Sequence, residues 1–187
     1  LSNHTAGFSG FTFRDLSDDM PAISAQWKKD KIAFDAIYTG YLGSIKQIDY
    51  VRSIFREHCN GLRIVDPAMA DNGKLYVGFD EAYAAEMAKL CFEADITLPN
   101  ITEACMMTGF EYRESYDRAY IDALLAKMCE LGAQTIILTG VTYREGRTGV
   151  VVNKNGVSTY YEHKKIAGGC HGTGDVYASA FVGAVMQ

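Results

Sequence analysis

Short apolar segments alternate with helical segments along most of this 187-residue chain, and that alternation limits the folds it can adopt. A predicted strand at 34–39 ends in Gly40, and the helix after it begins at a capping-box pair, Ser44 with Gln47 three residues later. Strands that take turns with helices form a mostly parallel sheet with helices on both faces, because each connection crosses over the sheet. The sequence therefore predicts an α/β fold.

The further elements follow from apolar periodicity and from residues that begin or end helices. The clearest helix covers 116–131, where apolar residues recur every three or four positions and Gly132 ends the run. Asn155-Gly156 is a favoured tight turn, so the β-rich stretches on either side of it are predicted to form a hairpin. The other predicted strands are 61–65, 95–98, 135–138, 148–153 and 157–162, and the other predicted helices are 80–92, 100–109 and 176–186.

Composition narrows the classes of function. The length and the 48% hydrophobic content fit one domain with a full core. A formal charge of −5, with basic residues scattered along the chain, argues against a nucleic-acid partner or an anionic membrane surface. No apolar run reaches the roughly 20 residues needed to cross a bilayer, and the start does not resemble a signal peptide, so we expect a cytoplasmic protein. The five cysteines form no C-x-x-C pair, which favours neither a disulfide framework nor a structural zinc site.

The segment 168–177 carries the strongest chemical signal. Four glycines precede a helix, so backbone N–H groups and the positive end of the helix dipole can be directed at one anion such as a phosphate. Asp175, in the first turn, would repel that anion unless it has another task, such as taking a proton from a hydroxyl group that attacks the phosphate. The alternative is that Thr173 caps the helix and Asp175 only compensates its dipole. Short glycine motifs leave both interpretations open.

Polar or permissive residues also follow several predicted strands, where ligands of such sheets gather. Asp66 and Asp71 flank one of these loops and could hold a magnesium ion together with substrate phosphates. Their alternative is a solvated turn, since Asp71-Asn72-Gly73 is an ordinary turn sequence. Asn100 and Glu103 have capping-box spacing, so a purely structural role is open for them too. The strand ends are Thr39-Gly40-Tyr41, Asp66-Pro67, Pro99-Asn100 and Thr139-Gly140.

Together these segments resemble the pyridoxal/pyridoxamine kinases, the vitamin B6 kinases of the ribokinase-like superfamily. The resemblance implies a three-layer α/β/α sandwich with a mostly parallel central sheet, and a single kinase domain across residues 1–187. It also implies that the first strand and the C-terminal elements of the family lie outside this segment. Five ordered motifs carry it: Leu1-Ser2-Asn3-His4-Thr5, residues 38–44, residues 65–71, residues 94–100 with Glu103, and Gly172-Thr173-Gly174-Asp175.

The resemblance further implies an ATP-dependent phosphorylation of the 5′-hydroxyl of pyridoxal, pyridoxamine or pyridoxine. Asp175 would be the general base that accepts the hydroxyl proton. The anion hole for the transferring phosphoryl group would be formed by Gly172, Thr173 and Gly174. The contacts to the B6 vitamer would be made by Asn3, His4, Thr5 and Tyr41.

ATP and Mg²⁺ are the cofactors that the resemblance implies, and a monovalent cation such as K⁺ is a further candidate. Asp71 and Glu103 would organise the magnesium and its waters, with Asn100 beside the phosphates and Asp66 near the same network. The nucleotide would be bordered by Thr139 and Gly140. A homodimer is the expected assembly.

Two features separate the B6 kinases from alternatives. A hydroxymethylpyrimidine kinase of thiamin synthesis shares the glycine loop, but it commonly has cysteine at the position of Asp175. The segments Ser2-Asn3-His4-Thr5 and Thr39-Gly40-Tyr41 favour a B6 substrate. A non-catalytic ligand-binding relative is the second alternative, and the presence of Asp175 argues against it. The chain departs from the family at Ala70, where glycine is usual, and at Leu98, where threonine is frequent.

Overall fold

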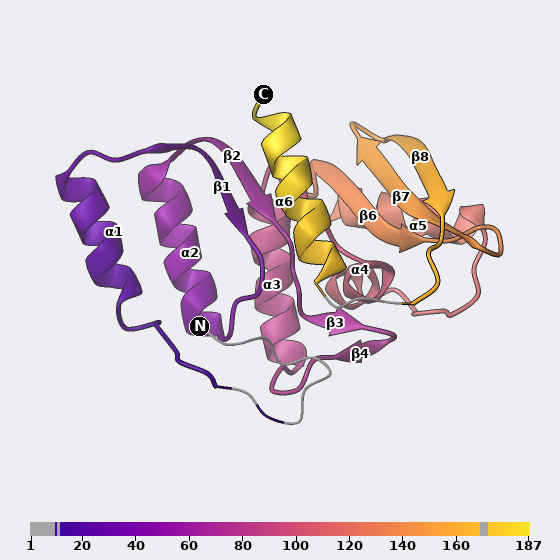
Figure 1. Ribbon diagram of the computed structural model, residues 1–187, viewed down its shortest axis with the longest axis horizontal. Coiled ribbons are helices and arrows are strands. Elements are labelled where there is room, and N and C mark those ends of the chain that lie inside the picture. The colour runs from indigo at the N-terminus through magenta and orange to yellow at the C-terminus, as the bar shows by residue number, and fades with distance from the viewer. Residues whose placement is uncertain (1–9, 11, 169–171) are drawn as a thin grey trace.

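The computed structural model describes the chain except for residues 1–9, 11 and 169–171. Its described part contains a six-stranded central sheet and a separate two-stranded ribbon (Figure 1). The sheet strands are β1 (Phe34–Thr39), β2 (Cys59–Val65), β5 (Ile96–Thr97), β6 (Thr135–Val141), β7 (Arg147–Lys154) and β8 (Val157–Lys164), and the ribbon strands are β3 (Ala70–Asp71) and β4 (Lys74–Leu75). The helices are α1 (Met20–Lys29), α2 (Ile45–His58), α3 (Glu81–Glu93), α4 (Ile101–Thr108), α5 (Arg118–Glu130) and α6 (Thr173–Val185).

The central sheet has the order β1-β2-β5-β6-β7-β8. Neighbours from β1 to β6 are parallel, whereas β7 and β8 add antiparallel strands at one side. The turn between β7 and β8 is Asn155-Gly156, and both residues have positive φ, 55° and 77°, as a type I′ hairpin turn requires. The predicted α/β fold with a mostly parallel sheet is therefore confirmed.

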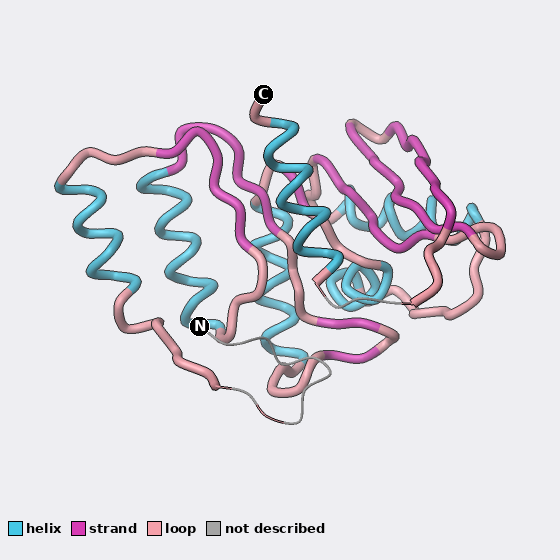
Figure 2. Tube along the Cα trace, in the orientation of Figure 1, coloured by secondary structure: helices cyan, strands magenta, loops and turns pink. Residues whose placement is uncertain are grey.

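Two hydrophobic cores cover the two faces of the sheet. The larger core joins one face to helices α2, α3, α4 and α5, with Ile48, Met87 and Leu124 among its fully buried residues. Helix α6 lies on the opposite face, where Ala178 packs with Ile64 and other apolar residues of the sheet (Figures 1 and 2). Helix–sheet–helix layering is the arrangement that the alternation of elements predicts. Among the described residues no helix is long and apolar enough to span a bilayer.

The predicted cap at the start of α2 is present, but its capping box is incomplete. The Ser44 hydroxyl accepts a hydrogen bond from the Gln47 N–H at 3.3 Å, as predicted. The Gln47 side chain, however, accepts from the Gly43 N–H at 2.7 Å, whereas a complete capping box would use the N–H of Ser44 itself. The predicted box is thus half formed: the backbone N–H of Gln47 binds the Ser44 hydroxyl, but the Gln47 side chain binds the preceding loop.

Helix α1 is absent from the elements that the sequence predicts. None of its residues is buried, although Met20, Ile23 and Trp27 recur at helical spacing and Met20 packs against the larger core. Tertiary contacts hold it against α2: the Ser24 hydroxyl lies 2.9 Å from Nε2 of buried His58, and the Trp27 ring meets the His58 ring edge to face at 5.6 Å.

Other boundaries differ from prediction by one to three residues, and three of them bear on the site or on the sheet. Helix α6 begins at Thr173, three residues earlier than predicted, with Gly172 as its N-cap at φ 85°, so Thr173 is not the cap. Helix α5 begins after Asp117, which leaves Tyr116 outside it. Strand β6 runs on to Val141 because a β-bulge at Gly140 lets pairing with β7 continue.

Gly61 and Gly183 offer a matched test of the packing. A Cβ at Gly61 would overlap the backbone carbonyl of Asp35 on β1, whereas Gly183, on α6, has no heavy atom within 4 Å of the same added atom. We expect Gly61→Ala to lower the free energy of unfolding of the complete protein by more than about 2 kcal/mol. Gly183→Ala should raise it by roughly 0.5–1 kcal/mol through helix propensity. Urea unfolding measures both, and equal effects would contradict the close approach of β1 and β2.

Candidate functional site

The carboxyl ends of the parallel strands share one edge of the sheet with ribbon β3–β4 and the first turn of α6 (Figure 1). Asp66 follows β2 directly, and its N–H donates to the Thr39 carbonyl at the end of β1 at 2.8 Å. Asn100 follows β5 and is bridged to Thr139 of β6. The polar strand ends predicted from sequence thus lie side by side.

Asp66 has a partly buried carboxylate with two donors. Oδ1 accepts from the Ala68 N–H at 3.1 Å, and Oδ2 lies 3.5 Å from the Tyr38 hydroxyl, which donates to it. Burial and the negative charge of Asp175 raise the pKa of Asp66 to about 6, against the opposing effect of the two hydrogen bonds. Asp66 therefore titrates close to neutral pH and lies within electrostatic reach of Asp175.

Asn100 and Glu103 form the complete capping box of α4. The Asn100 Oδ1 accepts from the Glu103 N–H at 2.9 Å, and the Glu103 Oε2 accepts from the Asn100 N–H at 2.8 Å. The structural interpretation of this pair is confirmed. The same side chains also reach the ribbon, because Asn100 Nδ2 donates to the Ala70 carbonyl at 2.8 Å.

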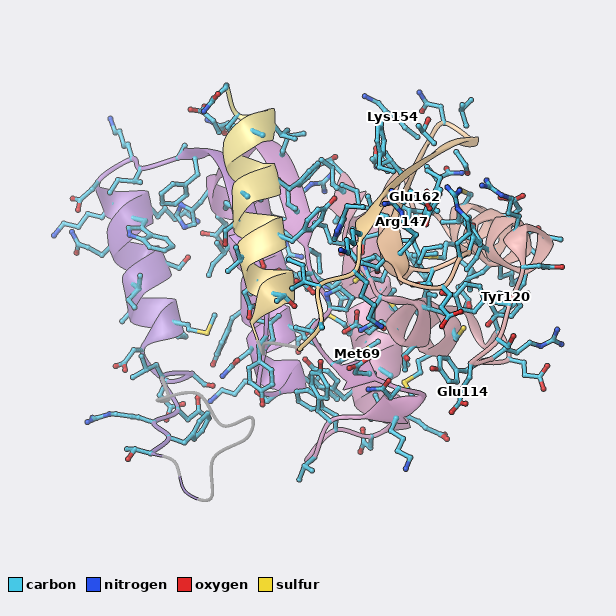
Figure 3. All side chains as sticks on the ribbon, turned by 45° about the vertical axis from the view of Figure 1, so that its right-hand side comes forward. Met69, Glu114, Tyr120, Arg147, Lys154 and Glu162 are labelled. Carbon is cyan, nitrogen blue, oxygen red and sulfur yellow. The ribbon has the colours of Figure 1, made fainter. Side chains whose placement is uncertain are left out.

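Glu103 is only 2% exposed, and both carboxylate oxygens are occupied by backbone donors. Oε1 accepts from the N–H groups of Met69 at 2.9 Å and of Ala70 at 3.4 Å. Met69 is fully buried at the centre of the molecule, between the ribbon and α4 (Figure 3). Burial raises the pKa of Glu103 to about 8 although the backbone donors act in the opposite direction. Glu103 thus ties α4 to the segment that leads into the ribbon.

Tyr76 marks where the predicted acidic residues converge, and the sequence did not single it out. Burial, the largest cause, and the charges of four carboxylates together raise the pKa of its phenol to about 12. In decreasing order of effect they belong to Glu103, Asp71, Asp66 and Asp175. Four carboxylates from three sequence segments therefore lie within electrostatic range of one hydroxyl. An aromatic residue three positions after a tight Asn-Gly turn was the only local signal for Tyr76.

Asp71 belongs to the turn that closes the ribbon. Its Oδ1 accepts from the Asn72 N–H at 2.8 Å, and Oδ2 accepts from Asn72 Nδ2 at 3.0 Å. Asn72 and Gly73 both have positive φ, so the turn interpretation of this segment is confirmed. The carboxylate is exposed and is free to take further ligands on its open side.

Tyr41 forms the exposed end of an aromatic stack. Its side chain is 55% exposed, and its ring centroid lies 5.4 Å from that of Phe79. Phe79 stacks on Tyr83 at 3.9 Å, and the Tyr83 hydroxyl donates to the Leu42 carbonyl at 2.5 Å. The Tyr41 ring, which Phe79 and Tyr83 support on one side, can therefore cover a flat ligand on its exposed side.

Thr139 and Gly140 sit at the bulge of β6. The Thr139 N–H and hydroxyl both donate to the Pro99 carbonyl, at 2.9 and 3.3 Å. Gly140 has φ 74° and is exposed, a conformation that glycine adopts without strain. The bulge brings the backbone of β6 beside the start of α4.

The first turn of α6 completes the site. Its N–H groups at Thr173, Gly174 and Asp175 precede the first intrahelical bond, which the Val176 N–H makes to the Gly172 carbonyl at 3.1 Å. The Asp175 side chain is exposed, yet its charge acts on Asp66, as shown above. Asn3, His4 and Thr5 lie outside the described residues, so their predicted placement stays a prediction.

Comparison with known proteins agrees with this arrangement. The sequence profile of the family described as phosphomethylpyrimidine kinase matches residues 13–187. A pyridoxine kinase of Bacillus subtilis is 28% identical over 84% of this chain and 60% of its own length. A Bacteroides thetaiotaomicron protein assigned as a phosphomethylpyrimidine kinase, solved with pyridoxal, is 34% identical with a TM-score of 0.89, over 100% of this chain and 67% of that one.

Pyridoxal kinase from Lactobacillus plantarum is 31% identical with a TM-score of 0.88, over 97% of this chain and 65% of that one. These likenesses confirm the ribokinase-like fold and the resemblance to the pyridoxal kinases. The chain spans about half the length of the curated relatives it matches, for example 46% of a pyridoxal kinase of Arabidopsis thaliana and 60% of the Bacillus relative.

The raised pKa of Asp66 predicts a pH dependence of stability. Between its ordinary value of 3.8 and about 6, the folded protein keeps a proton that the unfolded chain has released. The free energy of unfolding should therefore fall as pH rises through this window, by roughly 1–3 kcal/mol from this residue.

Urea unfolding of the complete protein between pH 4 and 7 measures this slope. Asp66→Asn should flatten it, whereas Asp35→Asn, which removes an exposed carboxylate from β1, controls for the change in net charge. A slope that is the same in wild type and Asp66→Asn would show that Asp66 is not desolvated.

Proposed function

This chain belongs to the phosphomethylpyrimidine kinase family, and we propose that the complete protein transfers the γ-phosphate of ATP to the 5′-hydroxyl of a B6 vitamer. One observation carries the proposal: Asp66 and Asn100 follow neighbouring parallel strands at one edge of the sheet, and the charge of Asp175, in the first turn of a glycine-led helix, acts on Asp66. A phosphoryl-transfer enzyme needs a base, amide donors and carboxylates for a metal at one place. The relatives named as pyridoxal and pyridoxine kinases support the same reaction.

In this proposal Asp175 accepts the proton of the attacking hydroxyl. Its exposed position on the first turn of α6 leaves it accessible to a substrate alcohol. The N–H groups at Thr173 and Gly174, with Gly172 ahead of them, stabilise negative charge on the phosphoryl oxygens. Catalysis then rests mainly on alignment of the alcohol with the phosphate, since phosphoryl transfer involves little covalent chemistry by the protein.

A magnesium ion fits the donor set. No group of three potential ligands stands ready to hold a metal among the described residues, and Mg²⁺ commonly uses one or two carboxylates and completes its shell with phosphates and waters. Asp71 presents an exposed carboxylate for this purpose, whereas both oxygens of Glu103 are engaged with backbone N–H groups. Glu103 would therefore influence the metal through the position of the ribbon that carries Asp71. The ion would neutralise charge on the nucleotide phosphates.

The remaining site residues take their expected places in this scheme. Thr139 and Gly140 border the nucleotide at the bulge of β6, with Asn100 next to them. Tyr41 covers the ring of the vitamer. Several expectations from the sequence stay predictions. They are contacts of Asn3, His4 and Thr5 with the vitamer, use of K⁺, a single kinase domain, a homodimer, the lack of nucleic-acid and membrane partners, and a cytoplasmic location.

A hydroxymethylpyrimidine kinase is the second candidate, because the description of the matching family favours it. Both substrates are flat nitrogen heterocycles that carry a hydroxymethyl group. The Tyr41 ring, here called the aromatic shelf, and the proposed base Asp175 could therefore serve either substrate. The structure of the Bacteroides relative with pyridoxal favours the B6 vitamers.

An ADP-release assay of the complete protein with magnesium-ATP tests the function. Pyridoxal, pyridoxamine, pyridoxine and hydroxymethylpyrimidine are offered in parallel. We expect a B6 vitamer to give the highest kcat/KM. A preference for hydroxymethylpyrimidine would establish the second candidate. If none of the four compounds stimulates ADP release, both candidates are contradicted.

Asp175→Asn removes the proposed base with little change in size. We expect the turnover rate to fall by about 10²- to 10⁴-fold while ATP still binds, because general base catalysis contributes on that order. Steady-state kinetics and ATP titration measure the two effects. Asp122→Asn on α5 is the matched control and should keep its activity. Near-normal turnover in Asp175→Asn would remove this residue from the assigned role.

Tyr41→Ala tests the aromatic shelf. Loss of the ring should raise KM for pyridoxal by about 10-fold and leave KM for ATP within about two-fold, since one ring contact contributes about 1 kcal/mol or more. Tyr161→Ala, an exposed tyrosine on β8, is the control. A rise in KM for ATP alone would place the vitamer elsewhere.

A further inference from the structure

The side chain of Gln47 uses its acceptor and its donor group in two directions. Oε1 accepts from the Gly43 N–H at 2.7 Å, in the loop that follows β1. Nε2 donates to the Ser17 hydroxyl at 2.8 Å and to Asp15 Oδ1 at 3.2 Å, in the segment ahead of α1. A single amide on the first turn of α2 therefore connects two loops that are about 30 residues apart in the sequence.

The partners of Gln47 are themselves fixed. Ser17 is 6% exposed, and both its N–H and its hydroxyl donate to Asp15 Oδ1, at 2.8 and 2.5 Å. These two bonds hold the pKa of Asp15 below its usual range, with the Ser17 hydroxyl as the largest cause. Asp15 is therefore a charged acceptor at neutral pH, which orders the segment that Gln47 contacts.

The loop on the other side of Gln47 carries Tyr41. Its backbone is held twice: the Leu42 carbonyl accepts from the Tyr83 hydroxyl of α3, and the Gly43 N–H is bound by Gln47 of α2. A Cβ built on Gly43 would lie 3.6 Å from Gln47 Nε2 and 3.7 Å from the Tyr41 ring, so both side chains flank Gly43. The orientation of the Tyr41 shelf thus depends on the Gln47 amide.

We propose that Gln47 is a positioning residue for the vitamer: it holds the Tyr41 loop on the Asp15–Ser17 segment and so sets the substrate side of the site. This inference rests on the proposed function, because it takes Tyr41 as the cover of the substrate ring. Glutamine suits the position because one group accepts from Gly43 while the other donates to Ser17 and Asp15. A glutamate would lose both donated bonds and would place a second negative charge beside Asp15.

Kinetics of the complete protein test the inference. Gln47→Ala should raise KM for pyridoxal by about 10-fold, with KM for ATP and kcat within about two-fold, because displacement of a positioning group of about 1 Å can cost more than that. Gln47→Glu should have a larger effect in the same direction. Gln26→Ala, which removes an exposed glutamine amide on α1, is the matched control and should leave all three constants unchanged.

Ser17→Ala is a second test of the same connection, and it leaves the sequence of α2 unchanged. It should raise KM for pyridoxal in the same way, and the effect of the double variant Gln47→Ala/Ser17→Ala should be smaller than the sum of the single effects, since both remove one connection. Thermal unfolding of every variant monitors folding, and pyridoxal titration without ATP gives an affinity that does not depend on turnover.

The outcomes separate the two proposals. If the wild type binds and phosphorylates pyridoxal while Gln47→Ala and Ser17→Ala leave its KM and affinity unchanged, or shift both substrates equally, the positioning role is wrong and the proposed function stands. If the wild type neither binds nor phosphorylates pyridoxal, the proposed function fails and the inference fails with it.

Discussion

The buried carboxylate of Glu103 is the interaction on which the geometry of this site depends. It accepts the N–H groups of Asn100, Met69 and Ala70, so it closes the first turn of α4 and also fixes the chain that leaves β2. An isolated buried carboxylate is costly, and three amide donors offset that cost. Because of this connection the ribbon that carries Asp71 and Tyr76 cannot move independently of the sheet edge. The predicted acids therefore lie within electrostatic range of one another.

This arrangement of carboxylates has an electrostatic consequence. The charges of Asp66, Asp71, Glu103 and Asp175 all raise the pKa of the Tyr76 phenol, and Asp175 raises that of Asp66. Mutual repulsion of this kind opposes folding and favours any cation that can enter. A magnesium ion with a nucleotide would remove the repulsion, which is consistent with the proposed phosphoryl transfer. Sites of function commonly retain such unfavourable arrangements because ligand binding relieves them.

The position of the proposed base is decided by the smaller of the two cores. Helix α6 has one buried residue, Ala178, which packs against Ile64 and Ile137 on the sheet face opposite to α2–α5. That contact sets the distance between Asp175 and the strand ends, whereas the glycine at the N-cap leaves the first-turn amides uncovered. Substrate alignment has a separate support, the loop between β1 and α2, which Gln47 and Tyr83 hold from two helices.

Neighbouring residues in the sequence determined the elements that local chemistry defines. Strand β1 has the predicted bounds, Asn100 and Glu103 form the predicted box, and Asn155-Gly156 turns the hairpin, because caps, alternation and turns depend on residues a few positions apart. The resemblance to the B6 kinases named the site residues. Only the tertiary structure decided that α1 forms without a buried residue, that the Gln47 side chain binds the N–H of Gly43 and not that of Ser44, and that four carboxylates act electrostatically on Tyr76. Each of these depends on partners brought together by packing of the sheet, and no local pattern encodes such contacts.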